Sequence, residues 1–155
     1  MKIIVLSDIH GDLYRARKAL SMQRSAEVVI FCGDGWRDIE ELKLENPEKT
    51  FLTVCGNCDW SCSYPPTDHI TLEGKSIYFT HGHLFHVKYG EYEIKEWARE
   101  NKADILLFGH THYAENKYED GLYVMNPGSC SGYGASFGTI EIKDGYVLTN
   151  IVKLD

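Results

Sequence analysis

Short apolar runs alternate with amphipathic stretches along the first two thirds of the chain. The runs at residues 2–7 (KIIVLS), 27–32 (EVVIFC), 50–55 (TFLTVC) and 105–108 (ILLF) have the length of strands and predict buried strands. The stretches between them predict helices over residues 12–24, 36–45 and 92–101. Asp12 is available as the N-cap of the first helix.

Further strands are predicted from the middle of the chain to its C-terminal end. Residues 69–72 and 76–80 flank a turn at 73–75, and further strands are expected at 113–118, 122–125, 137–142 and 146–152. Asp120-Gly121 and Asp144-Gly145 fit hairpin turns. The whole pattern predicts an α/β protein with helices outside and sheet inside, and does not decide between one sheet and two.

Composition narrows the class of protein. A length of 155 residues with 43% hydrophobic and 25% charged residues predicts one globular domain over residues 1–155. The net charge of −7 argues against broad nucleic-acid binding. The opening apolar run from Ile3 to Leu6 is too short for a signal peptide or a membrane span, so a cytoplasmic protein is expected. With five cysteines and no export signal, a disulfide framework is not expected.

Polar residues beside glycine follow five of the predicted strands. Because the carboxyl ends of strands in open α/β sheets meet at one crevice, these segments are expected to converge. Residues two apart on an extended chain face the same way, so such pairs can present two ligands together. The segments are Asp8-Ile9-His10-Gly11-Asp12, Gly33-Asp34-Gly35, Gly56-Asn57-Cys58-Asp59, Thr80-His81-Gly82-His83 and Gly109-His110-Thr111-His112.

These segments predict a metal centre. Any one of these segments alone is more often a capped turn or a group of exposed polar residues. Five together are hard to explain without metal, because burying converging Asp and His side chains without partners costs free energy. Mixed carboxylate, imidazole and amide ligands suit Mn, Ni, Fe, Co or Zn and do not suit calcium. A single catalytic zinc keeps about three protein ligands, so the candidates are enough for two ions. The candidate ligands are Asp8, His10, Asp34, Asn57, His81, His110 and His112.

The five segments resemble, in order, the motifs of the calcineurin-like metallophosphoesterase superfamily, and more closely its small YfcE-type phosphodiesterases. Met125-Asn126-Pro127-Gly128-Ser129 extends the resemblance. It implies a four-layer αββα sandwich with two mixed β-sheets. It also implies that one ion is held by Asp8, His10 and His112. The second would be held by Asn57, His81 and His110, with Asp34 bridging the two.

The resemblance also implies a reaction. A hydroxide shared by the two ions would attack phosphorus in line with the leaving oxygen, while Asn57 and His81 orient the phosphate. Many members of the superfamily have histidine where this chain has Cys58, and Asp59 normally pairs with that histidine. A thiol is a poorer proton donor than imidazolium, so the general acid is open, and Cys58 and Asp59 are the candidates.

Several alternatives stay open. A retromer subunit related to this fold serves as a protein-interaction platform, so a non-catalytic metal-binding scaffold is the main rival hypothesis. A nuclease is a second rival, although the acidic balance argues against nucleic acid as the substrate. A small phosphate ester, first of all a phosphodiester, is the expected substrate.

Cys55, Cys58 and Cys62 also suggest, more weakly, a redox motif or a zinc knuckle. Edge strands near the C-terminus would permit a homodimer or a higher homo-oligomer.

Overall fold

The computed structural model describes residues 1–155, which form two five-stranded sheets. The first sheet has the strand order β10-β9-β1-β2-β3 and the second the order β4-β5-β6-β8-β7. The first contains β1 (Lys2–Leu6), β2 (Val28–Phe31), β3 (Thr50–Thr53), β9 (Ser136–Lys143) and β10 (Tyr146–Lys153). The second contains β4 (Thr67–Leu72), β5 (Lys75–Thr80), β6 (Ile105–Leu107), β7 (Glu115–Glu119) and β8 (Leu122–Asn126).

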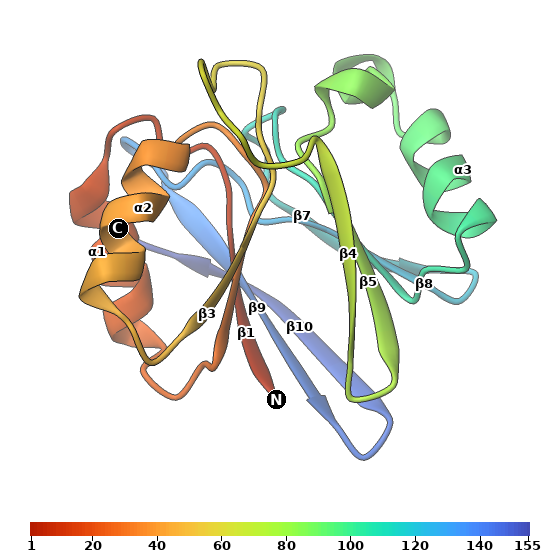
Figure 1. The fold of residues 1–155 in the computed structure, drawn as a ribbon. Helices are drawn as coiled ribbons and strands as arrows, with labels where there is room; N and C mark the ends of the chain where they lie inside the picture. The colour runs from red at the N-terminus through yellow and green to blue at the C-terminus, as the bar shows by residue number, and fades with distance from the viewer.

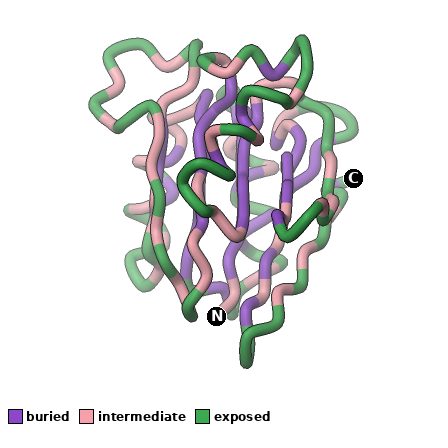
Figure 2. Tube along the Cα trace, turned by 90° about the vertical axis from the view of Figure 1, so that its right-hand side faces the viewer, coloured by how far each residue is buried: buried purple, intermediate pink, exposed green.

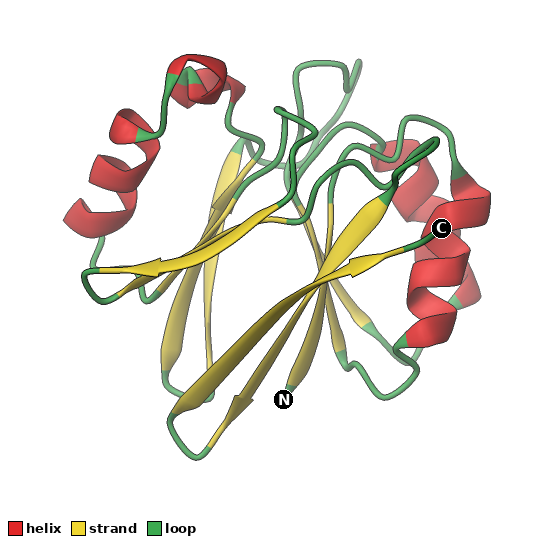
Figure 3. Ribbon diagram, turned by 180° about the vertical axis from the view of Figure 1, so that it is seen from behind, coloured by secondary structure: helices red, strands yellow, loops and turns green.

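The helices cover the outer faces of the two sheets (Figures 1 and 3). Helices α1 (Leu13–Met22) and α2 (Trp36–Glu45) lie against the first sheet, whereas α3 (Tyr92–Glu100) lies against the second. Two short 3-10 turns, η1 (His83–Phe85) and η2 (Val87–Tyr89), precede α3. The order of layers is therefore helix, sheet, sheet, helix, which confirms the predicted αββα sandwich.

Both faces of the central strands are buried, which explains their unbroken apolar sequences (Figure 2). In β1, Ile4 and Leu6 pack in the core beneath α1 and α2. Ile3 and Val5 point the other way and join the core between the sheets. A third core lies under α3 and includes Leu106 from the centre of β6. The central strands are therefore held by apolar packing on both of their faces.

Parallel pairing brings the functional loops to one edge of the sandwich. β1 pairs with β2, and β2 with β3, all parallel, and β5, β6 and β8 are parallel in the second sheet. The loops after these strands therefore leave from the same edge of each sheet, at the top in Figure 1. The antiparallel strands β9 and β10, β4 and β7 complete the sheets at their other positions.

The hairpin turns require a left-handed backbone. Asp120 and Gly121 have φ of 45° and 81°, and Asp144 and Gly145 have φ of 51° and 81°. Positive φ at both central residues is typical of type I′ turns, so both predicted turns are confirmed. The turn predicted at 73–75 is shorter, because Lys75 already belongs to β5. The strand predicted at 113–118 begins later, at Glu115. None of the helices is both long enough and apolar enough to cross a bilayer.

Candidate metal centre

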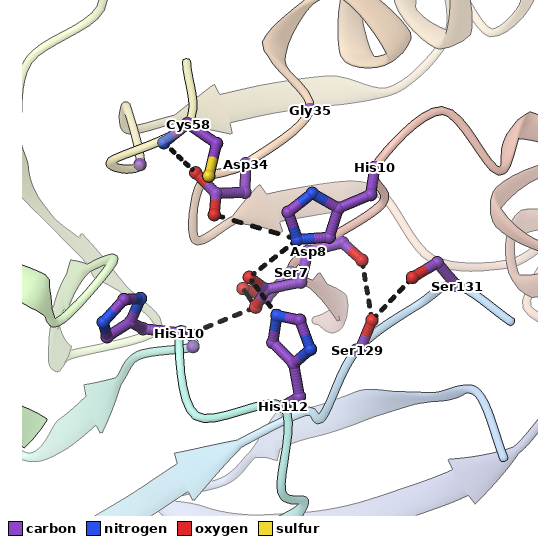
Figure 4. Close-up of polar contacts among 12 residues, drawn as sticks. Ser7, Asp8, His10, Asp34, Gly35, Cys58, His110, His112, Ser129 and Ser131 are labelled. Carbon is purple, nitrogen blue, oxygen red and sulfur yellow. Dashed lines mark hydrogen bonds and ion pairs between the residues drawn. The ribbon is translucent and has the colours of Figure 1, made fainter. Parts of the chain in front are cut away.

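Four loops from the two sheets bring most of the predicted ligands together. Asp8 follows β1 and Asp34 follows β2, both in the first sheet. His81 follows β5, and His110 and His112 follow β6, in the second sheet. Figure 4 shows Asp8 at the middle of this group, with imidazole rings around it.

Asp8 is fully buried and its two oxygens have different surroundings. Oδ2 accepts hydrogen bonds from the Ser7 hydroxyl at 2.5 Å and from the His110 backbone N–H at 3.1 Å. Oδ1 has no hydrogen-bond partner. It instead faces the Nε2 atoms of His112 at 3.2 Å, His10 at 3.5 Å and His81 at 3.8 Å. One buried oxygen is therefore surrounded by potential metal-binding nitrogens.

Asp34 is the second buried carboxylate of the cluster. Its Oδ1 accepts the Cys58 backbone N–H at 2.8 Å. Its Oδ2 lies 3.2 Å from His81 Nε2 and 3.8 Å from His10 Nε2. Burial opposes ionisation of this carboxyl, but the hydrogen bond to His81 and the His81 charge outweigh it and lower the Asp34 pKa to about 2. Asp34 is thus an anion between two histidines.

His81 is held with one nitrogen facing the other candidate ligands. Its Nδ1 lies 2.7 Å from the Cys32 carbonyl oxygen, which can only accept, so Nδ1 carries the hydrogen. Nε2 therefore faces the cluster, an arrangement usual for metal-binding histidines. Burial alone would lower the His81 pKa, but the hydrogen bond to Asp34 and the charge of Asp8 raise it.

His110 completes the histidine side of the cluster. Its Nδ1 lies 3.2 Å from His81 Nε2. Burial and the nearby His81 charge lower the His110 pKa to about 4, so this ring is neutral at physiological pH. A neutral imidazole is the form that binds metal.

The residues fit a metal ion. Ligand atoms of Asp8, His10 and His112 lie within 4.8 Å of one another, as do those of Asp8, Asp34 and His81. Leaving the buried Asp8 Oδ1 without a partner is costly, and a cation between the oxygen and the imidazoles would remove that cost. Two carboxylates with several imidazoles are donors that suit a divalent transition metal.

The backbone at the cluster is strained in a way that supports this interpretation. The strained residues have φ in the left-handed region, where non-glycine residues are uncommon and which costs about 1–2 kcal/mol each. Such strain concentrates at functional sites. These residues are Asp8 (55°), His10 (45°), Asp34 (68°), His110 (71°) and His112 (66°).

The loop after β3 contributes less directly than predicted. Asn57 is exposed, and its side-chain amide contacts only the Cys58 sulfur, at 3.5 Å. The structure therefore does not bring the Asn57 side chain into the cluster. Cys58 is exposed and free. Partial desolvation of its thiol, together with the charge of Asp34, raises the pKa of this group. The Cys58 backbone N–H contacts the cluster by donating to Asp34.

Asp59 organises two loops. Its carboxylate accepts backbone N–H groups of Asp34 at 2.8 Å, Gly35 at 2.7 Å, Trp36 at 3.2 Å and Gly56 at 2.7 Å. These bonds join the loop after β2 to the loop after β3. Asp59 therefore holds the backbone that carries Asp34, and it has no side-chain contact with a proton donor such as Cys58.

No disulfide framework is expected from the sequence, and the structure contains a single disulfide that the sequence did not predict. Cys55 and Cys62 are bonded, with their Cα atoms 6.2 Å apart. The loop between them turns back sharply enough to bring both within disulfide reach, which spacing alone does not reveal. The bond closes the loop that carries Asn57 and Asp59. A Cys55–Cys58 redox pair or a zinc knuckle would need Cys55 as a free thiol. Because Cys55 is bonded to Cys62 and Cys58 is free, the structure argues against both.

Sequence reasoning missed three residues that support the cluster. Ser7 binds Asp8 Oδ2, and the Ser129 hydroxyl donates to the Asp8 carbonyl at 2.9 Å. The Asn126 amide donates to the Gly109 carbonyl at 3.1 Å and to the Thr111 hydroxyl at 2.9 Å, which fixes the loop between His110 and His112. Asn126 and Ser129 lie in the Asn-Pro-Gly-Ser segment, so that motif was the available signal.

Comparison with known proteins agrees with the geometry. A family model described as the calcineurin-like phosphoesterase superfamily domain matches residues 1–145. The chain is 32% identical over 160 residues to "Phosphodiesterase MJ0936" of Methanocaldococcus jannaschii, which covers 93% of this chain and 93% of that protein. It is 28% identical over 168 residues to "Phosphodiesterase YfcE" of Escherichia coli, which covers 91% of this chain and 88% of that protein.

A solved structure supports the fold directly. The crystal structure of a predicted phosphoesterase from Streptococcus pneumoniae superposes with a TM-score of 0.80 at 30% sequence identity. The match covers 98% of this chain and 88% of that chain. The sandwich and its loops are thus shared along almost the whole sequence.

Proposed function

This chain belongs to the calcineurin-like phosphoesterase superfamily, and on that premise we propose that it is a phosphodiesterase that uses two divalent transition-metal ions to hydrolyse a small phosphate ester by in-line attack of water. The family membership makes it a metal-dependent hydrolase. The number of ions, the metal and the geometry of attack are our proposal.

One observation carries the proposal most strongly. Asp8 Oδ1 is buried without a hydrogen-bond partner, and three imidazole Nε2 atoms surround it. Asp34 Oδ2 lies between His10 and His81. In our assignment His10 binds the first ion together with Asp8 and His112, and His81 binds the second together with His110. Asn57 lies outside the cluster in this structure and would join the second ion only after its side chain turns toward it. Asp34 is then positioned to bridge the two sets.

The chain's own residues have distinct roles in this reaction. Bound cations would lower the pKa of a shared water and neutralise charge on the phosphoryl oxygens. His81, fixed by the Cys32 carbonyl, orients the phosphate, and Asn57 would help only with its side chain turned toward the ions. Asp59 holds the loop of Asn57 through its backbone bonds. Because Cys58 offers a thiol where imidazolium is the better proton donor, we expect preference for esters whose leaving groups need no protonation.

A screen of phosphate esters against each metal tests the proposal. Protein freed of metal with a chelator and reloaded with Mn, Ni, Fe, Co or Zn is assayed with bis(p-nitrophenyl) phosphate, p-nitrophenyl phosphate and a single-stranded oligonucleotide, with metal content measured on the same samples. We expect turnover of the diester that depends on bound metal and is abolished by chelator. The net charge of −7 predicts little cleavage of the oligonucleotide.

The same screen separates the rival functions. A protein that binds two ions and turns over none of the esters would be a metal-binding scaffold. Cleavage of the oligonucleotide in preference to the small diester would make it a nuclease. A cytoplasmic location and assembly into a homodimer or a higher homo-oligomer stay predictions of the sequence.

A further inference from the structure

A groove opens directly beside the metal-ligand cluster, between the start of α2 and the loop after β3. It has a volume of about 400 Å³. His10 and Asp34 line it from the cluster, and Trp36, Arg37 and Trp60 line it from outside. We name it the Trp36–Trp60 groove. A phosphate held at the cluster would extend one of its ester groups into this space.

The walls of the groove are held in place. The Trp36 indole N–H donates to the Trp60 carbonyl at 3.1 Å, which joins α2 to the loop after β3. Asp59 accepts the Trp36 backbone N–H at 3.2 Å and also the Gly35 N–H at 2.7 Å. The same carboxylate that positions Asp34 therefore also positions the backbone of Trp36. Fixing the backbone of both walls lowers the cost of ordering them when a ligand binds.

The groove offers one free aromatic surface and one free cation. Trp60 is 81% exposed, and its ring stacks on no other aromatic ring. The Arg37 guanidinium lies 5.1 Å from the centre of the Trp36 ring and forms neither an ion pair nor a hydrogen bond. Three carboxylates also line the groove, but Asp34, Asp38 and Asp59 each accept hydrogen bonds from the backbone. Arg37 is thus the charged lining residue that is left without a partner, and it favours an anionic ligand.

We propose that the Trp36–Trp60 groove binds the base of a nucleotide-type substrate, with the phosphate at the metal ligands, the base stacked on Trp60 and Arg37 supplying positive charge. This inference rests on the proposed phosphodiesterase function and names its substrate class. A small nucleotide ester combines the two features that the groove matches, a planar aromatic group and a negative charge close to it.

Binding of AMP and ribose 5-phosphate to metal-loaded protein tests the inference. The two probes share sugar and phosphate and differ only in the base. Isothermal titration should show AMP binding about tenfold more tightly than ribose 5-phosphate, the order of magnitude expected for one stacked base. Trp60→Ala should bring the two affinities within about twofold, whereas Trp60→Phe, which keeps a ring, should retain most of the difference.

The variants separate stacking from charge. Arg37→Gln should weaken both probes by a similar factor, because both are anionic. Tyr146→Ala removes another exposed aromatic ring, on β10, and should change neither affinity. Equal affinity of AMP and ribose 5-phosphate for the unmodified protein, or no binding of either, would overturn the proposal. Retention of the AMP preference in Trp60→Ala would overturn it as well.

Failure of the groove and failure of the proposed function give different results. Titration needs no turnover, so AMP binding that depends on Trp60 in a protein without esterase activity would preserve the groove and refute the hydrolase. Turnover of bis(p-nitrophenyl) phosphate with equal binding of the two probes would preserve the hydrolase and refute the groove.

Discussion

Asp34 combines two contacts that a neutral side chain cannot reproduce. Its Oδ1 accepts the Cys58 N–H, and its Oδ2 faces His81 and His10. In Asp34→Asn, the amide group must face either the Cys58 N–H or the imidazoles, and each placement removes an acceptor. We therefore expect loss of bound metal and at least about a hundredfold drop in kcat/KM. Mutation of residues that only orient the metal ligands already lowers metal affinity or activity by 10- to 100-fold.

Metal content by mass spectrometry and diester turnover measure the effect of Asp34→Asn. Asp144→Asn is the matched control, because Asp144 also has a positive φ of 51° but lies in the remote β9–β10 turn. The control should keep full metal content and rate. Full occupancy and turnover in Asp34→Asn would show that Asp34 does not bridge the ions.

Asp59 is predicted to act through the backbone rather than on the substrate. Its carboxylate satisfies four N–H groups, so Asp59→Ala leaves them without a protein acceptor. We expect destabilisation of about 3 kcal/mol in urea unfolding. Asp68→Ala, which removes an aspartate that accepts only the His69 N–H, should cost less than about 1 kcal/mol.

A catalytic role for Asp59 would give another result. If Asp59→Ala kept its stability and lost turnover with metal still bound, Asp59 would act in the reaction itself. If stability, metal content and turnover fall together, the backbone role accounts for the loss.

At the residue scale, the sequence revealed donor types but not their conformation. Asp8, Asp34 and His81 could be predicted to meet because each follows a buried parallel strand. Their neighbours could not be predicted in the same way. The left-handed φ of His110 and the outward position of Asn57 arise only when loops from both sheets close on one another.

At the scale of elements, the loop between β3 and β4 depends on its disulfide. Cys55 and Cys62 close a short loop, with a sequence separation of 7. The loop-closure model assigns such a bond about 2.5 kcal/mol of stability. Cys55→Ser with Cys62→Ser should therefore lower the urea midpoint, and reduction of the unmodified protein should have the same effect.

Cys58→Ser is the control for the disulfide, because Cys58 is exposed and unpaired. Its midpoint should match that of the oxidised protein. Alkylation followed by mass spectrometry reports the pairing directly. Labelling of both Cys55 and Cys62 under oxidising conditions would contradict the bond.

Elements with a strong local pattern could be predicted closely, and their packing could not. The helix predicted at residues 36–45 has the observed bounds, because its apolar face and the following Pro47 both mark it. Strand ends shifted by one or two residues where hydrogen bonding to a neighbour, rather than sequence, sets the limit. β3, for example, ends at Thr53. The pairing of Cys55 with Cys62 depends on the path of a loop that has no periodic pattern.

At the scale of the molecule, the metal centre exists only because two sheets pack together. The first sheet supplies Asp8, His10 and Asp34, and the second supplies His81, His110 and His112. Strands buried on both faces have the same apolar sequence in one sheet as in two, so periodicity could not choose between them. The resemblance to a known family could, because it placed all the motifs in one architecture.

A pair of carboxyl groups joins the α3 layer to the second sheet and gives the fold a pH dependence of its own. Glu91 lies at the N-cap position of α3, and Glu115 begins β7. Lys117 Nζ lies 2.9 Å from Glu91 Oε1 and 3.4 Å from Glu115 Oε1. Burial is the main cause that raises the Glu115 pKa to about 7, and the hydrogen bond and charge of Glu91 add to it. Glu91 shifts the other way: its burial is outweighed by the hydrogen bond with Glu115 and by Lys117, which lower its pKa.

Glu115→Gln is therefore expected to become progressively more stable than the unmodified protein as the pH rises from about 4.5 to 7. Below the unfolded pKa of 4.5, Glu115 is protonated in both states. Between 4.5 and 7, the unfolded chain releases this proton before the folded one does, so folding stability falls as the pH rises. Glutamine keeps the neutral form and avoids the loss. Urea unfolding of metal-free protein at pH 5 and pH 8 measures the difference in stability. Glu119→Gln is the control. Lys95 and Lys117 lower the Glu119 pKa, so this variant should show no gain in stability as the pH rises. A gap between Glu115→Gln and the unmodified protein that did not widen with pH would mean that Glu115 is already ionised in the folded state.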